Sequence, residues 1–291
     1  MNNLGTLYFY RDRLGEAEPL FVAALAGQRR LWSSDHETVL NGMNNLGNLY
    51  ARQGRTAEAE PLMRATLEAK RRVLGEEHPK TLVSISNLAA LYINSARYDD
   101  AEPLCRQALE IRRRVLGPEH PNTLRAAGNL ALVYAGQRRY EEADALYQES
   151  LTVQRRVLGE THQDTLRTLQ NLADLYRQQS DFQRAEPLYV RVLDGRRQLL
   201  GETHHETLET GAGLLAALVG LQRYADAESL GLKCFEAHVA ARGPAHAGTL
   251  AVARSLADLY GAWGKSEQAA QWEARLAATQ PATESAPRGP M

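Results

Sequence analysis

The 291-residue sequence lacks the features of a secreted, membrane-spanning or nucleic acid-binding protein. It contains only 2 cysteines, which cannot make a disulfide scaffold, and nothing in it indicates an oxidising compartment. Its 34 basic and 35 acidic residues leave a formal charge of -1, whereas nucleic acid and anionic membranes demand a basic excess. The longest apolar stretch, Gly213 to Leu221, is far shorter than the roughly 20 residues of a spanning helix. We therefore expect a soluble cytoplasmic protein with neither nucleic acid nor membrane as a partner.

Catalytic, metal-binding and cofactor motifs are missing as well. The sequence has no glycine-rich phosphate loop, no Ser-His-Asp set and no carboxylate pair with a plausible pocket. Cys234 and His238 lie one helical turn apart, but a structural zinc site needs four ligands. Cys105 is three units away from Cys234, so both thiols are expected to be buried and free. We expect no enzyme activity, no metal and no cofactor.

What the sequence contains is a repeat of 42 residues. The triplet Asn-Leu-Gly at residues 3–5 returns as Asn-Leu-Gly or Asn-Leu-Ala beginning at Asn45, Asn87, Asn129 and Asn171. Seven units share one register without insertion or deletion, and such periodicity indicates a stacked repeat protein. The units lie at about 1–33, 34–75, 76–117, 118–159, 160–201, 202–243 and 244–278, followed by a Pro/Ala/Ser-rich tail at 279–291 that is expected to be disordered.

Each unit has the pattern of two helices. In the second unit Met43, Leu46, Gly47 and Tyr50 form one stripe of a 3.6-residue helix, and a longer stripe runs from Ala59 through Leu67 to Val73 and Leu74. A glycine after the second helix is the usual residue of a left-handed cap, and it recurs as Gly75, Gly117, Gly159, Gly201 and Gly243. A histidine in the following loop also recurs, which favours a turn or packing role: His36, His78, His120, His162, His204 and His246. One helix pair cannot bury its apolar stripe alone, so the pairs must stack.

The residues at these positions identify a family. Leu46, Gly47, Tyr50 and Ala59 have the spacing of the tetratricopeptide repeat (TPR), and the 42-residue period resembles that of the kinesin light chain variety. The resemblance covers about residues 1–278 and implies an all-α, right-handed superhelical solenoid of seven helix-turn-helix units. Such arrays bind extended peptides in a concave groove lined by the first helices. No heptad coiled coil precedes the repeats, so a motor role is not expected.

Counting along the first helices predicts which residues line that groove. Asparagine can donate to and accept from a peptide backbone, and arginine pairs with carboxylates, so the resemblance and the lining together predict an extended, acidic peptide as the ligand. The predicted groove residues are Asn44, Asn45, Asn48, Arg52, Asn87, Asn94, Arg125, Asn129, Arg167, Asn171, Asp174, Arg177 and Gln178.

Two alternatives stay open at this point. The asparagines that recur in every unit, at Asn3, Asn45, Asn87, Asn129 and Asn171, are equally compatible with a structural role in bonding an adjacent helix. Met1 falls partway along a first helix, so the chain is also compatible with a sensor or scaffold arm cropped from a larger signalling protein, such as an ATPase switch or a kinase. The oligomeric state is not predicted.

Overall fold

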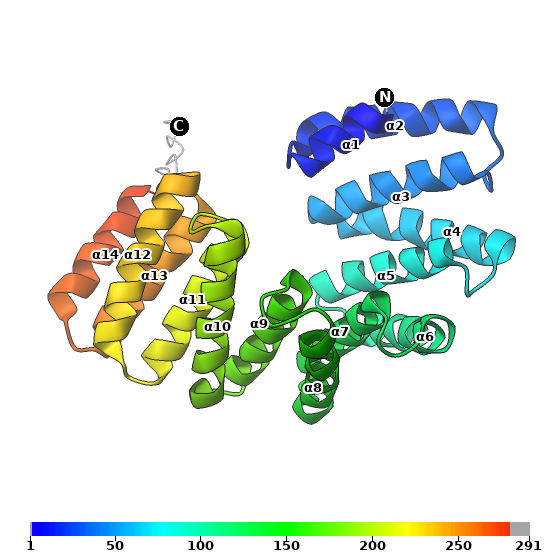
Figure 1. The fold of residues 1–291 in the computed structure, drawn as a ribbon. Coiled ribbons are helices and arrows are strands. Elements are labelled where there is room, and N and C mark those ends of the chain that lie inside the picture. Colours follow the sequence, from blue (N-terminus) through cyan, green and yellow to red (C-terminus); the bar gives the residue numbers. More distant parts are fainter. Residues whose placement is uncertain (1, 280–291) are drawn as a thin grey trace, which may run out of the picture. The chain divides into compact units, whose positions relative to one another are not determined.

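The computed structural model describes residues 2–279, and every regular element in that range is an α-helix (Figure 1). The first helices of successive hairpins are α1 (Asn2–Tyr10), α3 (Glu37–Arg52), α5 (Pro79–Asn94), α7 (Pro121–Gly136), α9 (Gln163–Gln178), α11 (His205–Gly220) and α13 (Ala247–Ala262). The second helices are α2 (Leu14–Leu31), α4 (Thr56–Leu74), α6 (Tyr98–Leu116), α8 (Tyr140–Val157), α10 (Phe182–Leu200), α12 (Tyr224–Arg242) and α14 (Ser266–Thr279). The predicted all-α helical repeat solenoid is confirmed.

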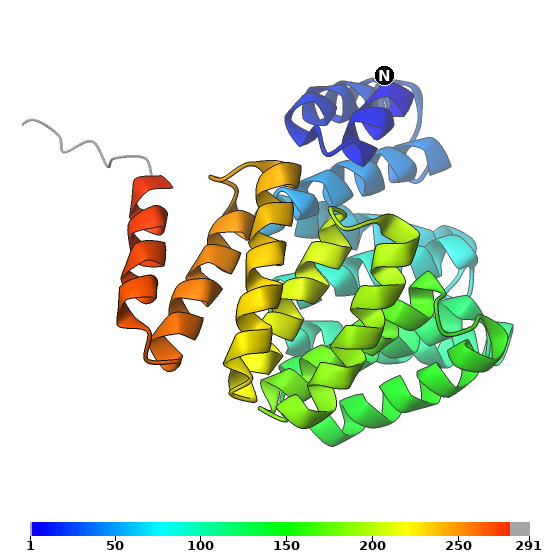
Figure 2. The ribbon, with the colours of Figure 1, turned by 60° about the vertical axis from the view of Figure 1, so that its left-hand side comes forward.

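The chain divides into two compact units, residues 1–150 and 151–291, and α8 runs from one into the other. From α1 to α7 in the first unit and from α9 to α14 in the second, helices that follow one another in the sequence lie side by side (Figures 1 and 2). The first helices also contact one another, α1 with α3, α3 with α5 and α5 with α7 in the first unit, and α9 with α11 and α11 with α13 in the second. These contacts give each unit a surface built from its first helices, which we call the first-helix face.

The recurring histidines begin the first helices. In α3, α5, α7, α9, α11 and α13 the preceding histidine is the N-cap, and its Nδ1 accepts a hydrogen bond from the backbone N–H two residues later. The distance ranges from 3.0 Å, between His246 and Gly248, to 3.4 Å, between His204 and Glu206. A side-chain acceptor at this position satisfies one of the N–H groups that the first turn leaves unpaired. The turn role predicted for the histidines is confirmed.

The glycines that end the second helices differ from the prediction in one respect. Gly75 has φ 87° and ψ 166°, and Gly117 and Gly201 have nearly the same angles. The positive φ was expected, but a left-handed cap would need ψ near +47°. The extended ψ places these residues in a region that is essentially open only to glycine. The left-handed cap was therefore wrong, because the chain leaves the helix in an extended direction.

The buried face of the second helix also departs from the prediction. In α4 the predicted residues Ala59, Met63 and Leu67 are buried, but Val73 and Leu74 are 53% and 39% exposed. The inner face passes instead through Thr66 and Lys70, which follow Met63 at helical spacing and are both buried. The apolar pattern missed this path because two of its members are polar.

Successive hairpins are joined by a ladder of ion pairs. A glutamate on five of the second helices meets a basic residue at the turn of the next hairpin, as in Arg97 Nη1 to Glu60 Oε2 at 2.5 Å. The guanidinium of Arg97 also lies 4.5 Å from the ring centre of Tyr92. The further pairs are Glu18–Arg55, Glu102–Arg139, Glu186–Arg223 and Glu228–Lys265. At the same register Asp181 replaces the basic residue and caps α10 by accepting from Arg184 N–H at 3.1 Å.

Three remaining predictions concern the ends, the cysteines and membrane spans. Cys105 and Cys234 are free and buried, as expected. Of the tail predicted at 279–291, only Thr279 belongs to the described residues, where it ends α14. Across residues 2–279, no helix combines the length and the apolar character that crossing a bilayer requires.

Candidate functional site

The recurring asparagines link neighbouring first helices in the first unit. Asn45 Nδ2 donates to Asn2 Oδ1 at 3.3 Å, and Asn87 Nδ2 donates to Asn44 Oδ1 at 3.1 Å. These contacts support the structural role for Asn45 and Asn87, with Asn44 as acceptor. The same position behaves differently further along, because Asn129 forms no side-chain hydrogen bond to any described residue. Two other predicted groove residues, Asn48 and Asn94, are likewise without hydrogen-bond partners among the described residues.

The predicted arginines of the first unit have unlike surroundings. Arg52 on α3 donates to the Phe9 carbonyl at 3.0 Å and pairs with Asp12 at 2.7 Å, so it ties two first helices together. Arg125 on α7 is exposed and donates to the neutral Asn122 Oδ1 at 2.8 Å. Among the described residues no carboxylate forms an ion pair with Arg125. Arg125 is therefore the predicted arginine whose charge is most available.

In the second unit four predicted residues of α9 line one cavity. This cavity has a volume of about 650 Å³ and lies between α9 and α11, and Arg196 of α10 also lines it. The predicted residues in its lining are Arg167, Asn171, Asp174 and Arg177, whereas Gln178 is exposed and does not take part. The other residues of the lining are Gln170, Arg196, His205, Glu206, Glu209, Ala212, Gly213 and Ala216.

A hydrogen-bond network fixes the α9 side of this cavity. Tyr189 Oη donates to Asp174 Oδ1 at 2.6 Å, and Arg177 Nε donates to Tyr189 Oη at 3.0 Å. Gln170 Nε2 donates to the other carboxylate oxygen of Asp174 at 3.1 Å. Burial, and then the neighbouring carboxylate, raise the pKa of the Tyr189 hydroxyl, which keeps it neutral and able to donate. Asp174 and Arg177 are thus held in place before any ligand arrives.

Arg196 is the α10 residue in the lining of the cavity. Arg196 is only 5% exposed, and its guanidinium donates to the Glu206 carbonyl at 2.9 Å and to Thr210 Oγ1 at 2.7 Å. The Glu206 carboxylate lies 3.1 Å from Arg196 Nη2 and supplies the opposite charge. Burial lowers the pKa of Arg196, and the Glu206 charge counteracts that effect. Its Nε is buried and has no hydrogen-bond partner among the described residues.

Arg196 belongs to a column of polar residues that the sequence analysis missed. The same register position of the second helix is polar in six consecutive units, and in five of them the residue is nine-tenths or more buried. The signal was available, since a polar residue recurs every 42 positions within an otherwise apolar helical face. We call these residues the polar column: Gln28, Lys70, Arg112, Gln154, Arg196 and His238.

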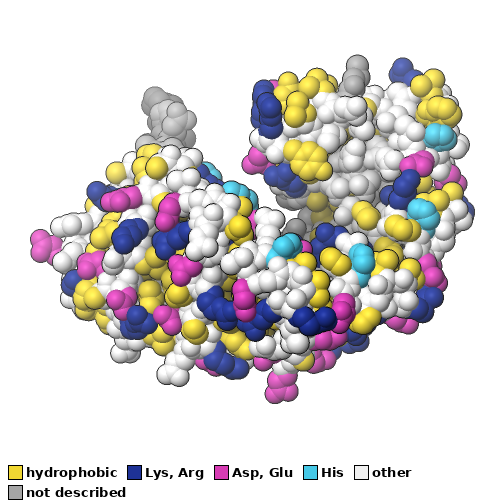
Figure 3. All heavy atoms as spheres, viewed as in Figure 1, with side chains coloured by type: hydrophobic (Ala, Val, Ile, Leu, Met, Phe, Trp, Pro, Cys, Tyr) yellow, Lys and Arg dark blue, Asp and Glu magenta, His cyan; other side chains and the backbone are white. Residues whose placement is uncertain are grey.

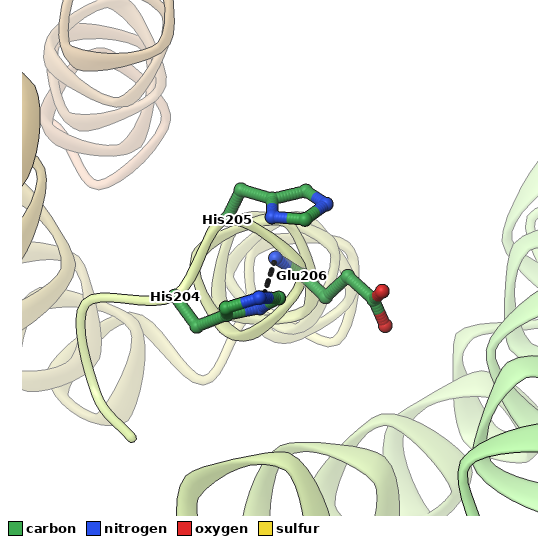
Figure 4. Close-up of side chains that lie close together, drawn as sticks. All are labelled: His204, His205 and Glu206. Carbon is green, nitrogen blue, oxygen red and sulfur yellow. Dashed lines mark hydrogen bonds between the residues drawn. The ribbon is translucent and has the colours of Figure 1, made fainter. Parts of the chain in front are cut away.

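One group of side chains in the described range could hold a metal ion by proximity. The ligand atoms of His204, His205 and Glu206 lie within 4.8 Å of one another. Figure 4 shows that His204 Nδ1 is used by the backbone N–H of Glu206 and that the Glu206 carboxylate points away from both imidazoles. That carboxylate pairs with Arg196 instead. We assign no metal to this group, because its members already serve the helix cap and the buried arginine.

Charge on the molecular surface is mixed in both units. In the view of Figure 3, lysine and arginine side chains alternate with aspartate and glutamate side chains over each unit. The long second helices carry much of this alternation as ion pairs, such as Arg72 with Asp35 and Arg114 with Glu77. Such exposed pairs contribute little to stability individually.

Together the helix hairpins and their strict register define an all-α helical repeat protein. Models described as tetratricopeptide repeat match residues 1–37, 39–80, 83–155 and 126–198. The chain belongs to the tetratricopeptide repeat family, and its repeats are of the kinesin light chain-like type. No curated protein sequence matches the chain significantly.

Three solved structures illustrate the likeness. A P. anserina kinesin light chain-type protein with nearly identical TPR-like repeats is 25% identical over 72% of this chain and 99% of its own, with a TM-score of 0.64. A Rap protein complexed with Competence and Sporulation Factor is 12% identical over 96% of this chain and 73% of its own, with a TM-score of 0.66. The STAND protein with a TPR sensor from Pyrococcus horikoshii is 13% identical over 95% of this chain and 41% of its own, with a TM-score of 0.67.

Proposed function

We propose that this chain is a non-enzymatic, cytoplasmic protein-interaction module that binds an extended, acidic peptide segment on its first-helix face. The observation that carries the proposal is the cavity between α9 and α11, which gathers four residues expected from the sequence to face a ligand. Arg167 at its rim is half exposed and can pair with a carboxylate of the ligand. An interaction role also fits the family, whose members are in general binding scaffolds.

The first-helix face of the first unit offers suitable groups for a peptide backbone. The amides of Asn48, Asn94 and Asn129 have no hydrogen-bond partner among the described residues, and each can both donate and accept. Such groups bind a backbone without selecting a side chain, so selectivity depends on the charged residues. Arg125 and Arg167 occupy the same register position in successive repeats and provide that charge.

The test compares two arginines of the second unit that are matched in exposure. The Arg167 and Arg191 side chains are each 47% exposed and each forms one ion pair, but only Arg167 lines the cavity. A peptide-display selection on the full chain is expected to enrich acidic extended sequences, to lose them with Arg167→Ala and to keep them with Arg191→Ala. Enrichment that survives Arg167→Ala, or no enrichment at all, would contradict the proposal.

A second candidate is a sensor arm within a larger signalling protein. The likeness to the STAND sensor of Pyrococcus horikoshii favours it, because this chain covers 41% of that protein. The DNA upstream of Met1 distinguishes the two functions. An in-frame continuation into a nucleotide-binding or kinase domain would support the sensor arm, and a stop codon directly upstream would remove it.

A further inference from the structure

Arg112 of the polar column is a buried cation without an opposite charge. The residue is 5% exposed, and its Nη2 donates to the Leu82 carbonyl at 3.1 Å and to Ser86 Oγ at 3.0 Å. Both acceptors are neutral, and no carboxylate among the described residues forms an ion pair with Arg112. Burial, and then the charge of Arg125, lower the pKa of Arg112, so the largest effect of a neighbouring charge comes from a second cation. Proteins rarely bury a charge unless a partner compensates it.

The repeat itself shows what a compensated version of this position looks like. Arg196 lies 84 residues after Arg112, in the same register, and there Glu206 supplies the carboxylate. The register equivalent of Glu206 beside Arg112 is the neutral Asn122, and that of Glu209 is the cationic Arg125. One fold position therefore carries its own counter-charge in the second unit and lacks one in the first.

The helices around Arg112 contain no acidic residue that could take this role. Neither α5 nor α7 contains a single aspartate or glutamate over its full length. The guanidinium is not sealed off from solvent. Its Nε and Nη1 form no hydrogen bond within the described structure, and neither of them is a fully buried atom. Asn129 has the same register position as Asn87, which donates to the preceding first helix. Beside Asn129, however, Arg112 donates to the hydroxyl of Ser86 on that preceding helix, and the Asn129 amide forms no hydrogen bond within the described structure.

We propose that Arg112, Arg125, Ser86 and Asn129 form a binding site for a phosphate group, carried by a phosphorylated residue of the bound peptide. Two uncompensated guanidinium groups match the charge of about -2 that a phosphorylated side chain carries near neutral pH. Guanidinium groups bind phosphate oxygens through paired hydrogen bonds, and the Asn129 amide can donate to a remaining oxygen. The Ser86 hydroxyl donates to the Leu82 carbonyl at 3.0 Å and accepts from Arg112, so its part in the site is to position that guanidinium. An aspartate or glutamate brings only one negative charge and would leave one guanidinium uncompensated. This inference rests on the proposed peptide-binding function and names one ligand group within it.

The experiment compares three peptide libraries on the full chain. They are identical except that one fixed position is phosphoserine, glutamate or serine, and inorganic phosphate serves as a competitor. Asn122→Glu is the decisive variant, because it places a carboxylate where Glu206 lies in the second unit. An acidic residue in the first turn of α7 also suits the helix dipole, so this variant is expected to fold at least as well as the parent. Arg114→Ala removes an exposed charge from the same helix as Arg112 and is the matched control.

We expect the phosphoserine library to bind at least about tenfold more tightly than the glutamate library, since one charge-assisted hydrogen bond is worth that much. Asn122→Glu and Arg125→Ala should abolish this preference, and Arg114→Ala should keep it. Equal binding of the phosphoserine and glutamate libraries would overturn the phosphate site and leave the proposed function standing. A preference that persists in Asn122→Glu would also overturn the site, whereas a failure of every library to bind would overturn both proposals.

Discussion

The histidine cap shows how one side chain sets the boundary of a helix in every repeat. His120 Nδ1 accepts the backbone N–H of Asn122 at 3.1 Å, and five other histidines do the same for their own helices. The imidazole must be neutral at Nδ1 to accept, which fixes the tautomer with its proton on Nε2. A residue that recurs in a loop for this reason is easily mistaken for a metal ligand.

We predict that His120→Ala lowers the free energy of unfolding by about 1 kcal/mol, the usual cost of losing an N-cap acceptor. His120→Asp should recover most of that loss, because aspartate is an efficient cap. Urea unfolding followed by circular dichroism measures both variants. Equal losses in the two would show that the imidazole acts through packing and not as a cap.

Glu60 predicts how part of the stability depends on pH. Hydrogen bonds from Arg97 first, and from Tyr92 and Arg64, lower the pKa of its carboxyl to about 2, although burial opposes them. A carboxyl with a lowered pKa stabilises the fold fully above its ordinary pKa of 4.5, and this contribution is lost as the pH falls towards 2.

Glu60→Gln should therefore be less stable than the parent by about 1–3 kcal/mol at pH 7, and the difference should shrink between pH 4.5 and 2. Urea midpoints of both proteins across that pH range provide the measurement. Glu110→Gln is the control, since Glu110 forms no ion pair in the described structure. A parent–variant difference that stays constant down to pH 2 would rule out the lowered pKa as the cause.

At the scale of the element, two glycines of successive repeats have positive φ but different requirements. Gly54, in the turn inside a hairpin, has φ 74°, and Ala96 occupies the same register in the next unit with φ 54°. Gly117, at the end of α6, combines φ 88° with ψ 161°. A Cβ at either glycine would meet open space, so only the backbone distinguishes them.

We predict that Gly117→Ala destabilises the fold by up to about 3 kcal/mol, because its backbone region excludes residues with a side chain. Gly54→Ala should cost only about 1 kcal/mol, since alanine tolerates the left-handed region at a modest penalty. Thermal unfolding of the two variants compares them directly. A larger loss for Gly54→Ala would contradict this account of the two turns.

The elements themselves could be predicted from the sequence, whereas their polar interiors could not. The apolar stripes, and the prolines at the start of α5 and α7 (Pro79 and Pro121), indicate helices that are present in the structure. Lysine and arginine are residue types that usually lie at the surface, and only the packing of two first helices against the second helix reveals that Lys70 and Arg112 are buried. Hydrophobic periodicity cannot detect a polar side chain on the inner face of a helix.

For the candidate site, the sequence could predict only which face of a first helix its residues occupy. Counting along α9 predicted that Asn171 and Asp174 lie on one face of the helix, and both line the cavity. Their partners Tyr189 and Arg196 lie on α10, and the contacts depend on how two helices pack, which a repeat period does not specify. The pairing of Asn45 with Asn2, which favours a structural role, was likewise open until the helices could be seen together.

At the scale of the whole molecule, a repeat array transmits a defect only to its neighbours. Leu130 in the middle and Leu256 near the end are both buried, at 4% and 0% exposure. Leu130→Ala should cost about 2–5 kcal/mol as a buried large-to-small change, and it should weaken the hairpins on both sides.

Leu256→Ala should leave most of the array intact and loosen mainly α13 and α14. Hydrogen exchange followed by mass spectrometry resolves the two patterns, because it reports protection for each helix separately. Increased exchange in α3 caused by Leu256→Ala would show that the chain unfolds as a single cooperative body, against the expectation for a repeat array.

The unbroken 42-residue register has a consequence for how this protein can change over generations. A duplication or exchange of one unit moves every member of the polar column by a whole period, so each unit brings a polar residue to the same position of its second helix. Arg112 with Asn122 and Arg196 with Glu206 are then two versions of the same position in the repeat, one without and one with a carboxylate. Shuffling units by recombination would rewrite the order of charges that a ligand must match, while each hairpin keeps its neighbours and its fold.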